Sequence, residues 1–237
     1  MAGAPKGGSL LEFANKARDA LSDVLSGLGP EGTRRSAPAD LPSSTVFLNV
    51  YDIVRSNNVL YYVGMGVHHT GVEVYGMEFA FGRCAGDTGV VQVEPKNTPP
   101  HTFREQLVLG TTKLTRGEVV ALLQEFKGNR EQWSGYSYHL VRNNCNHFSG
   151  AFAKRLLPPD VRFETYQEMM MGNGSNDVVE IYDNGERETV QLSNGNSVTV
   201  PVLMPSWVNR LASSAEGILG SKLVDSLDDM DKRAQVS

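Results

Sequence analysis

Cys145 stands where the chain passes from a short run of asparagines into an apolar stretch with helical spacing. Its sequence neighbours are all polar: Asn143, Asn144, Asn146 and His147. A thiol attacks a carbonyl group as the thiolate, and its pKa falls near a helix N-terminus or an imidazolium. The spacing predicts a helix that begins at about Cys145, whose unpaired N–H groups favour negative charge on a sulfur or an oxyanion. Cys145 is therefore a candidate nucleophile.

A cysteine nucleophile needs a histidine base that lies close to it in space. His147 comes two residues after Cys145 on the expected helix and faces another side, so it is predicted to cap or pack. His101 falls in an expected loop and is predicted to be solvated. His68 and His69 open a glycine-flanked strand, where the period of two lets only one of them face a cleft. The pattern by itself does not choose between these two histidines.

Two other interpretations of Cys145 involve no nucleophilic catalysis. A structural zinc site needs four ligands in a recognisable spacing, whereas Cys145 and His147 form one weak pair and Cys84 has no ligand partner near it in the sequence. We therefore predict neither a metal nor another cofactor. The second alternative is purely structural, with asparagine capping a helix that begins beside a half-buried thiol.

The elements that must position these side chains fall between residues 45 and 157. Strand-like runs are expected at 45–53, twice or three times within 58–83, at 89–95, at the end of 102–114 and at 136–141. Helices are expected at 116–128, where Thr115 can act as the N-cap, and from Cys145 to Leu157, where Pro158-Pro159 ends the helix. This mixture indicates a domain of both helices and strands.

The segments on either side have a different character. An amphipathic helix is expected within 9–28, followed by a linker at 30–43. Beyond the central part, a short helix is expected at 162–172 and further helix after residue 204. Between them, Asn-Gly pairs predict an acidic three-stranded meander with strands at 178–182, 187–192 and 197–202.

Composition narrows the class of protein. The net charge of −5 argues against a general nucleic-acid binder, which needs a dense basic surface. The sequence contains no apolar run long enough to cross a bilayer, and its first residues do not resemble a secretory signal. Two cysteines are too few for a disulfide framework, which suits a reducing compartment. We therefore expect a cytoplasmic or nuclear protein.

Four motifs together resemble the PPPDE family of permuted papain-fold peptidases, which includes the DeSI-type desumoylating isopeptidases. They are VYDI (50–53), HHTGVEVYGMEFAFG (68–82), YHLVRNNCNHFSGAFAKRLL (138–157) and PSWVNRLA (205–212). The resemblance covers about 45–160 and 205–212. It implies an α/β (α+β) fold, circularly permuted from papain, with a Cys–His dyad. Matched residue by residue, the dyad is His69 and Cys145, and His68 falls on a variable position.

The resemblance implies a cysteine isopeptidase that removes SUMO or ubiquitin from lysine through a thioester intermediate, with a possible homodimer as its assembly. The alternatives are a cysteine thioesterase (a protein S-deacylase) and a non-catalytic binding module. Gly64, Gly66 and Gly71, near the histidine strand, would suit close approach of a substrate backbone, and turns explain them equally well. The expected organisation is an extension at 1–44, a catalytic domain at 45–212 that contains a 160–204 insertion, and a C-terminal helix and tail at 213–237.

Overall fold

The computed structural model describes residues 41–53, 68–85, 87–171, 179–209, 225–226 and 228–229. The expected helix within 9–28 lies outside these residues, as do the candidate strand residues at 58–67 and most of the chain after 209. In the part described, the protein has the mixed α+β fold that was predicted, with a five-stranded antiparallel sheet and a separate two-stranded one. None of the helices in these residues is long and apolar enough to cross a bilayer.

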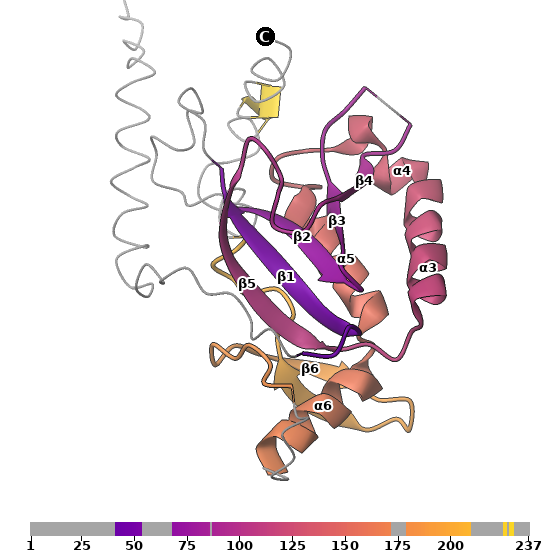
Figure 1. Ribbon diagram of the computed structural model, residues 1–237, viewed down its shortest axis with the longest axis vertical. Coiled ribbons are helices and arrows are strands. Elements are labelled where there is room, and N and C mark those ends of the chain that lie inside the picture. Colours follow the sequence, from indigo (N-terminus) through magenta and orange to yellow (C-terminus); the bar gives the residue numbers. More distant parts are fainter. Residues whose placement is uncertain are drawn as a thin grey trace, which may run out of the picture.

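The sheet has five strands in the order β4-β3-β2-β1-β5 (Figure 1). They are β1 (Thr45–Asp52), β2 (His68–Val74), β3 (Met77–Phe81), β4 (Val90–Val93) and β5 (Thr102–Thr111). Every pairing is antiparallel, and β1 lies between β2 and β5. The strands predicted at 45–53 and 89–95 and two strands within 58–83 are thus confirmed. The strand expected at the end of 102–114 begins earlier, at Thr102.

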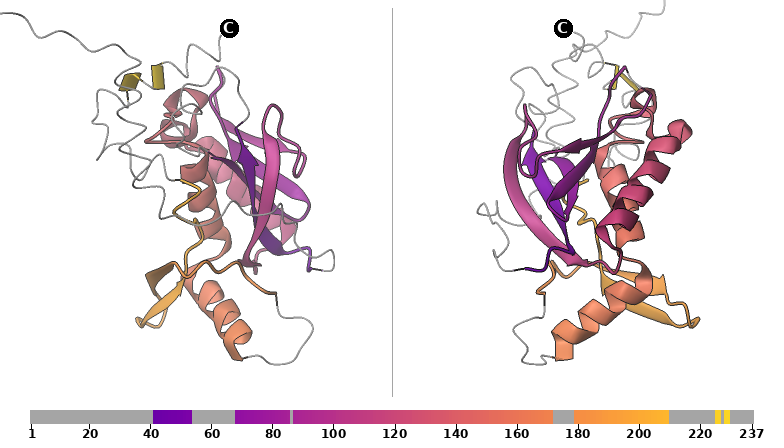
Figure 2. Two further views of the ribbon diagram at one scale, coloured as in Figure 1. Left: turned by 90° about the vertical axis from the view of Figure 1, so that its left-hand side faces the viewer. Right: turned by 45° about the vertical axis from the view of Figure 1, so that its right-hand side comes forward.

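Helices cover one face of this sheet, as the turned views of Figure 2 show. They are α3 (Arg116–Gly128), α4 (Arg130–Trp133), the single turn η1 (Gly135–Ser137) and α5 (Cys145–Leu156). A further helix, α6 (Pro159–Met171), lies at one end of the sheet (Figure 2). Helix α5 packs directly on β2 and β3, and α3 contacts α5 through Phe126, whose ring lies 5.6 Å from Phe148 and 5.2 Å from Phe152. This contact buries the apolar stripes of both helices.

The predicted helix caps are confirmed. Thr115 caps α3 in a capping box with Glu118, and Asn144 caps α5. The strand expected at residues 136–141 is wrong, because η1 occupies Gly135–Ser137 and His139 only bridges Asn143. The bridge closes a tight turn immediately before α5. Residues 136–141 therefore lead into this turn and form no strand of the sheet.

Alternation along the strands gives the sheet two different faces. Toward α5 lie apolar side chains of the core, such as Leu48, Val72 and Phe79. The other face carries a buried polar network centred on Glu78, whose carboxylate accepts hydrogen bonds from Tyr51 (2.7 Å) and Asn49 (2.6 Å). Burial raises the pKa of the Glu78 carboxyl group, against the lowering effect of these bonds.

The close approach expected at Gly71 has a different cause from the one predicted. A Cβ atom at this position would lie 2.1 Å from Oε1 of Glu78, which belongs to the neighbouring strand β3. The space beside Gly71 is therefore occupied by a side chain of the protein, and the glycine makes room for the buried carboxylate.

The segment after α5 forms a unit at one end of the sheet, seen at the bottom of Figure 1. Helix α6 packs against a two-stranded hairpin of β6 (Arg187–Gln191) and β7 (Ser197–Pro201), and Arg162 joins them by binding Glu188 (2.8 Å) and the Pro201 carbonyl (2.6 Å). The third predicted strand, at 178–182, is wrong. Residues 179–182 are irregular because the Tyr182 N–H bonds to the Val108 carbonyl of β5 instead (2.7 Å).

Candidate active site

Cys145 is the first residue of α5, as the sequence predicted. Oδ1 of Asn144 accepts a hydrogen bond from the His147 backbone N–H (3.1 Å), and Nδ1 of the His147 ring accepts one from the Asn144 backbone N–H (3.2 Å). This reciprocal capping confirms the structural role expected for His147. This capping occupies the backbone N–H of His147. The backbone N–H groups of Cys145 and Asn146 are left over, and both act to lower the pKa of the Cys145 thiol.

Polar groups surround the Cys145 sulfur. It lies 3.8 Å from Oδ1 of Asn146, and the Thr70 backbone N–H and the Tyr138 hydroxyl group both act to lower its pKa. The side chain is only 4% exposed, yet it is not a member of the apolar core cluster. Cys145 is thus a buried thiol with polar groups around it.

Burial nevertheless raises the pKa of the Cys145 thiol to about 11, although the Thr70 N–H, the Tyr138 hydroxyl and the N–H groups of the first helical turn act in the opposite direction. The helix N-terminus was expected to lower this pKa, and desolvation outweighs it. In this conformation Cys145 is a neutral thiol at physiological pH.

His69 lies on β2 directly opposite Tyr51 of β1. Its ring packs 5.9 Å from the Tyr51 ring and stacks on His101 with centroids 4.7 Å apart. Burial, and then the charge of His101, lower the pKa of His69 to about 3. Nε2 of His69 is buried and has no hydrogen-bond partner among the residues that the structure describes. His69 is thus a neutral imidazole with an unused nitrogen.

The two residues of the expected dyad are linked through their neighbours in the chain. The Thr70 hydroxyl donates to Oδ1 of Asn146 (2.8 Å), and the Thr70 N–H is one of the groups that lower the pKa of the Cys145 thiol. Within the described residues no hydrogen bond joins the two side chains, because the His69 ring turns toward His101 on the other face of β2.

His68 lies on the opposite face of β2 from His69, as the period of two requires. Its Nδ1 is 3.4 Å from Oδ1 of Asp52, which also accepts from Arg104 (3.2 Å), and its ring makes an edge contact with Trp207 (5.2 Å). A carboxylate beside an imidazole nitrogen orients the ring, so His68 is a second imidazole to be tested. The sequence analysis did not single out Asp52 as its partner; the cross-strand pairing of Asp52 with His68 creates this contact.

Asn146 is 3% exposed and makes hydrogen bonds to several different segments around the site. Its Nδ2 donates to the His68 carbonyl (3.2 Å), the Val208 carbonyl (3.3 Å) and Oδ1 of Asn209 (3.2 Å). These bonds attach the first turn of α5 to β2 and to the turn at residues 206–209. The first half of the PSWVNRLA motif therefore contacts the site through Val208 and Asn209. This segment was expected to be helical, but it forms a turn.

The remaining histidines have structural contacts. His101 was expected to be solvated, but it is half-buried under His69. His139 Nδ1 accepts from the Val141 and Arg142 N–H groups (3.2 Å each) and shapes the turn before Cys145. Among the described residues, no three His, Cys, Asp or Glu side chains are grouped as metal ligands.

Two surface depressions flank α5. One, of about 490 Å³, lies beside the turn that precedes Cys145, and polar residues line it: Asn129, Glu131, Gln132, Ser137, Arg142 and Asn143. The other, of about 400 Å³, lies along the helix between Asn146 and the segment that follows β7. Both are open and mainly shallow, and Cys145 itself lines neither of them.

Comparison with known families finds one matching model, described as "PPPDE putative peptidase domain", over residues 44–162. The match includes His68, His69 and Cys145 and ends within α6. It excludes the β6–β7 hairpin and the turn that holds Asn209.

Curated relatives carry related names. The chain is 36% identical over 117 residues to a DeSI-like protein of Arabidopsis thaliana (49% of this chain, 51% of the relative). It is 33% identical over 123 residues to the desumoylating isopeptidase 1 homolog of Caenorhabditis elegans (50% and 36%). It is 27% identical over 161 residues to the DeSI-like protein sdu1 of Schizosaccharomyces pombe (60% and 78%). The matched regions span about half or less of the first two relatives.

Proposed function

Because the chain belongs to the PPPDE peptidase family, we propose that it is a cysteine isopeptidase that cleaves a ubiquitin-like modifier from lysine. Cys145 is the proposed nucleophile and His69 the proposed base. The observation that supports this assignment best is the hydrogen bond from the Thr70 hydroxyl to Oδ1 of Asn146 (2.8 Å), which joins the residues that directly follow His69 and Cys145. It holds the N-terminus of α5, where Cys145 lies, against the strand that carries His69.

In the proposed reaction the Cys145 sulfur attacks the carbonyl carbon of the C-terminal glycine of the modifier, and the thiol proton passes to His69. The N–H groups of the first turn of α5 hold the oxyanion. His69 then gives its proton to the departing lysine amine, which leaves a thioester on Cys145. Water, deprotonated by His69, hydrolyses the thioester and releases the modifier.

The first proton transfer is strongly unfavourable in the conformation described, since the thiol has a pKa of about 11 and His69 a pKa of about 3. We infer that β2 rearranges at His69 when the glycine tail binds, because rotation about the side-chain bonds alone would leave the ring on the face of β2 that carries His101, away from the sulfur. An imidazole placed beside the thiol can then share the proton, as catalytic hydrogen bonds often tighten only in the complex.

SUMO is the first modifier to test, because the C. elegans relative is named a desumoylating isopeptidase. Ubiquitin, which shares the extended glycine tail, is the second. A thioesterase that removes acyl chains would need an apolar tunnel. Neither surface depression beside α5 is lined by Cys145, so a direct comparison of probes must decide between a peptide tail and an acyl chain.

The test uses SUMO, ubiquitin and an acyl chain, each carrying an electrophile at the carbonyl end. We expect the wild type to form a covalent adduct with a modifier probe, and Cys145→Ala to form none. Cys84→Ala is the matched control, because Cys84 is the exposed cysteine of the chain. Labelling that persists in Cys145→Ala would eliminate this nucleophile.

The histidines need a separate comparison. His69→Ala is expected to lose turnover of a modifier–lysine substrate by at least about a hundredfold, while His68→Ala retains most of it. The reverse result would transfer the role of base to His68 and its neighbour Asp52, and would leave the nucleophile and the reaction class unchanged. Circular dichroism of both variants checks that the sheet is intact.

A further inference from the structure

Near its C-terminal end the chain returns to the turn that leads into α5. Asp228 is 2% exposed, and its Oδ1 accepts hydrogen bonds from the Leu140 N–H (2.8 Å) and from the Arg83 guanidinium (2.7 Å). Leu140 lies between His139 and Asn143, whose bridge closes that turn. A buried carboxylate that is distant in the sequence therefore holds the backbone of the turn before Cys145.

Three hydrogen bonds in series connect Asp228 with the first turn of α5. The first is the bond from the Leu140 N–H to Asp228. In the second, the Leu140 carbonyl accepts from Nδ2 of Asn144 (2.8 Å), and in the third, Oδ1 of Asn144 accepts from the His147 N–H (3.1 Å). Asn144 is buried and directly precedes Cys145. The start of the helix that carries the sulfur thus depends on a backbone that Asp228 fixes.

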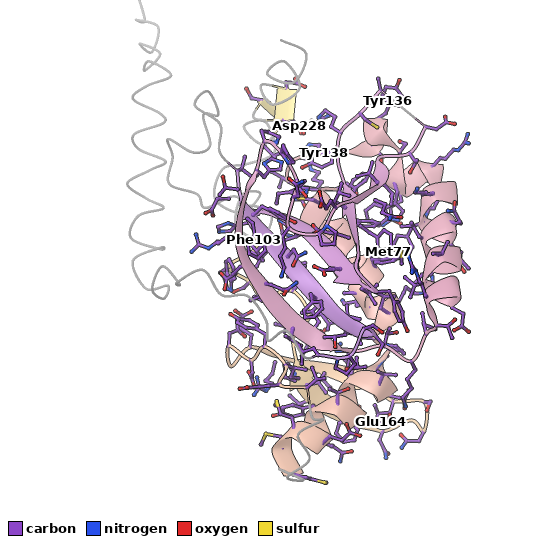
Figure 3. All side chains as sticks on the ribbon, viewed as in Figure 1. Met77, Phe103, Tyr136, Tyr138, Glu164 and Asp228 are labelled. Carbon is purple, nitrogen blue, oxygen red and sulfur yellow. The ribbon has the colours of Figure 1, made fainter. Side chains whose placement is uncertain are left out.

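Arg83 compensates the charge of this carboxylate. Its guanidinium pairs with Asp228 and also lies 5.1 Å from the centre of the Tyr138 ring, where a cation is attracted to the ring electrons. The Tyr138 ring packs in turn on Phe81 of β3, with centroids 5.4 Å apart. Figure 3 shows Tyr138 and Asp228 close together at the same end of the sheet. Because a buried charge is tolerated when it is paired and hydrogen-bonded, Arg83 anchors Asp228 beside β3.

A second carboxylate of the same segment makes a more exposed contact. Asp225 accepts from the Arg142 guanidinium (2.7 Å), but its side chain is 56% exposed and that of Arg142 is 40% exposed. An ion pair in contact with water contributes little to stability. Asp225 therefore offers a comparison with Asp228 in which residue type and segment are the same and burial differs.

We propose that Asp228 is a positioning residue for Cys145. Its carboxylate holds the Leu140 N–H, and through the cap at Asn144 it keeps the sulfur in the place from which it attacks the substrate. Asp228 itself does not contact the reacting atoms. The inference rests on the proposed function only for its effect on turnover, because the position of the sulfur is also measurable without a substrate.

Two substitutions separate the hydrogen bond from the charge. Asp228→Ala removes the oxygen that accepts from Leu140, whereas Asp228→Asn removes the charge and retains an amide oxygen. We expect Asp228→Ala to lower kcat for a modifier–lysine substrate by about ten- to a hundredfold with little change in KM, because a small displacement of a reacting atom slows the reaction strongly. Asp228→Asn should stay within about threefold of the wild type. A role confined to the ion pair with Arg83 would impair both variants alike.

The second measurement uses no substrate. In a Cys84→Ser background, iodoacetamide reacts with Cys145 as the remaining thiol, since the chain has two cysteines. Cys145 is buried in the intact site, so loss of the bond to Leu140 should expose it more often. We expect alkylation of Asp228→Ala to be about three- to tenfold faster than that of the parent, and alkylation of Asp228→Asn to be close to it.

Two control variants accompany both measurements. Asp225→Ala removes the exposed carboxylate of the same segment and should match the wild type. Val200→Ala removes methyl groups that are fully buried in β7, so its melting temperature should fall while kcat and the alkylation rate remain unchanged. It shows what lowered stability alone does. Should Asp228→Ala fail to fold, the same comparison is made in an Arg83→Gln background, where no guanidinium has lost its carboxylate.

The inference is overturned if Asp228→Ala matches Asp225→Ala in either measurement, or if Asp228→Asn is impaired as much as Asp228→Ala. The same changes in Val200→Ala would overturn it too, because they would then follow from stability alone. If the wild type turns over no modifier substrate, the proposed function fails, and the order of the alkylation rates alone decides whether Asp228 positions the thiol.

Discussion

The Thr70 hydroxyl donates to the Asn146 side chain at 2.8 Å, so the residues that directly follow His69 and Cys145 in the chain are bonded to each other. This bond crosses from β2 to the first turn of α5. Thr70 is fully buried, and its hydroxyl also lies 2.9 Å from that of Ser149. The relative position of the two proposed catalytic residues therefore depends on a small buried network of neutral polar groups.

Thr70→Val tests this network. Valine has nearly the same shape but leaves the Asn146 oxygen without its donor, so we expect a loss of about 1–2 kcal/mol in the free energy of unfolding. We also expect turnover to fall, because Asn146 positions the first turn of α5. Urea unfolding and turnover assays measure the two effects. Thr165→Val on α6, where the hydroxyl bonds only to the Val161 carbonyl (2.9 Å), is the matched control and should leave turnover unchanged.

The buried histidine predicts destabilisation by acid. His69 has a pKa of about 3 in the folded protein and about 6.5 when unfolded, so the unfolded chain binds the extra proton between these values. Stability is thus unaffected above the unfolded pKa and falls as the pH drops below it. Between pH 7.5 and 5 this group alone should cost about 2 kcal/mol. In His69→Gln, the free energy of unfolding measured with urea should fall less between pH 7.5 and 5 than in the wild type. The same dependence on pH in both proteins would contradict this prediction.

The two free cysteines should differ in reactivity. Cys84 is exposed and Cys145 is buried with a pKa raised to about 11. In the absence of substrate at neutral pH, we expect iodoacetamide to modify Cys84 first and Cys145 much more slowly. Peptide mass spectrometry after timed quenching measures both sites in one sample. Faster labelling of Cys145 would show that its thiolate is already formed in the free protein.

Gly71→Ala should disturb the polar face of the sheet. The new methyl group would lie 2.1 Å from the Glu78 carboxylate, which must then move away from its donors Tyr51 and Asn49. We expect a loss of about 2–3 kcal/mol in the free energy of unfolding. Gly82→Ala, where nothing lies within 4 Å of the added atom, is the control and should cost under about 1 kcal/mol. Equal losses in a urea titration would refute the steric explanation.

Local patterns were sufficient for the elements whose causes are local. Thr115 is the predicted N-cap of its helix, and Asn144 caps the helix that begins at Cys145. The predictions failed where a distant partner decides. Residues 136–141 have a strand-like composition, yet the His139–Asn143 bridge bends them into a turn. Residues 179–182 lost their expected strand because Tyr182 bonds to β5.

The sequence by itself determined that Cys145 begins a helix and that His68 and His69 face opposite sides of one strand, since both follow from the period of helix and strand. Only the tertiary structure decided the state of these groups. The neutral thiol and the neutral His69 arise from burial, which depends on every element packed around them. The contacts of Tyr138, Asp52 and Asp228 likewise join residues far apart in the chain, and no local pattern encodes such pairs.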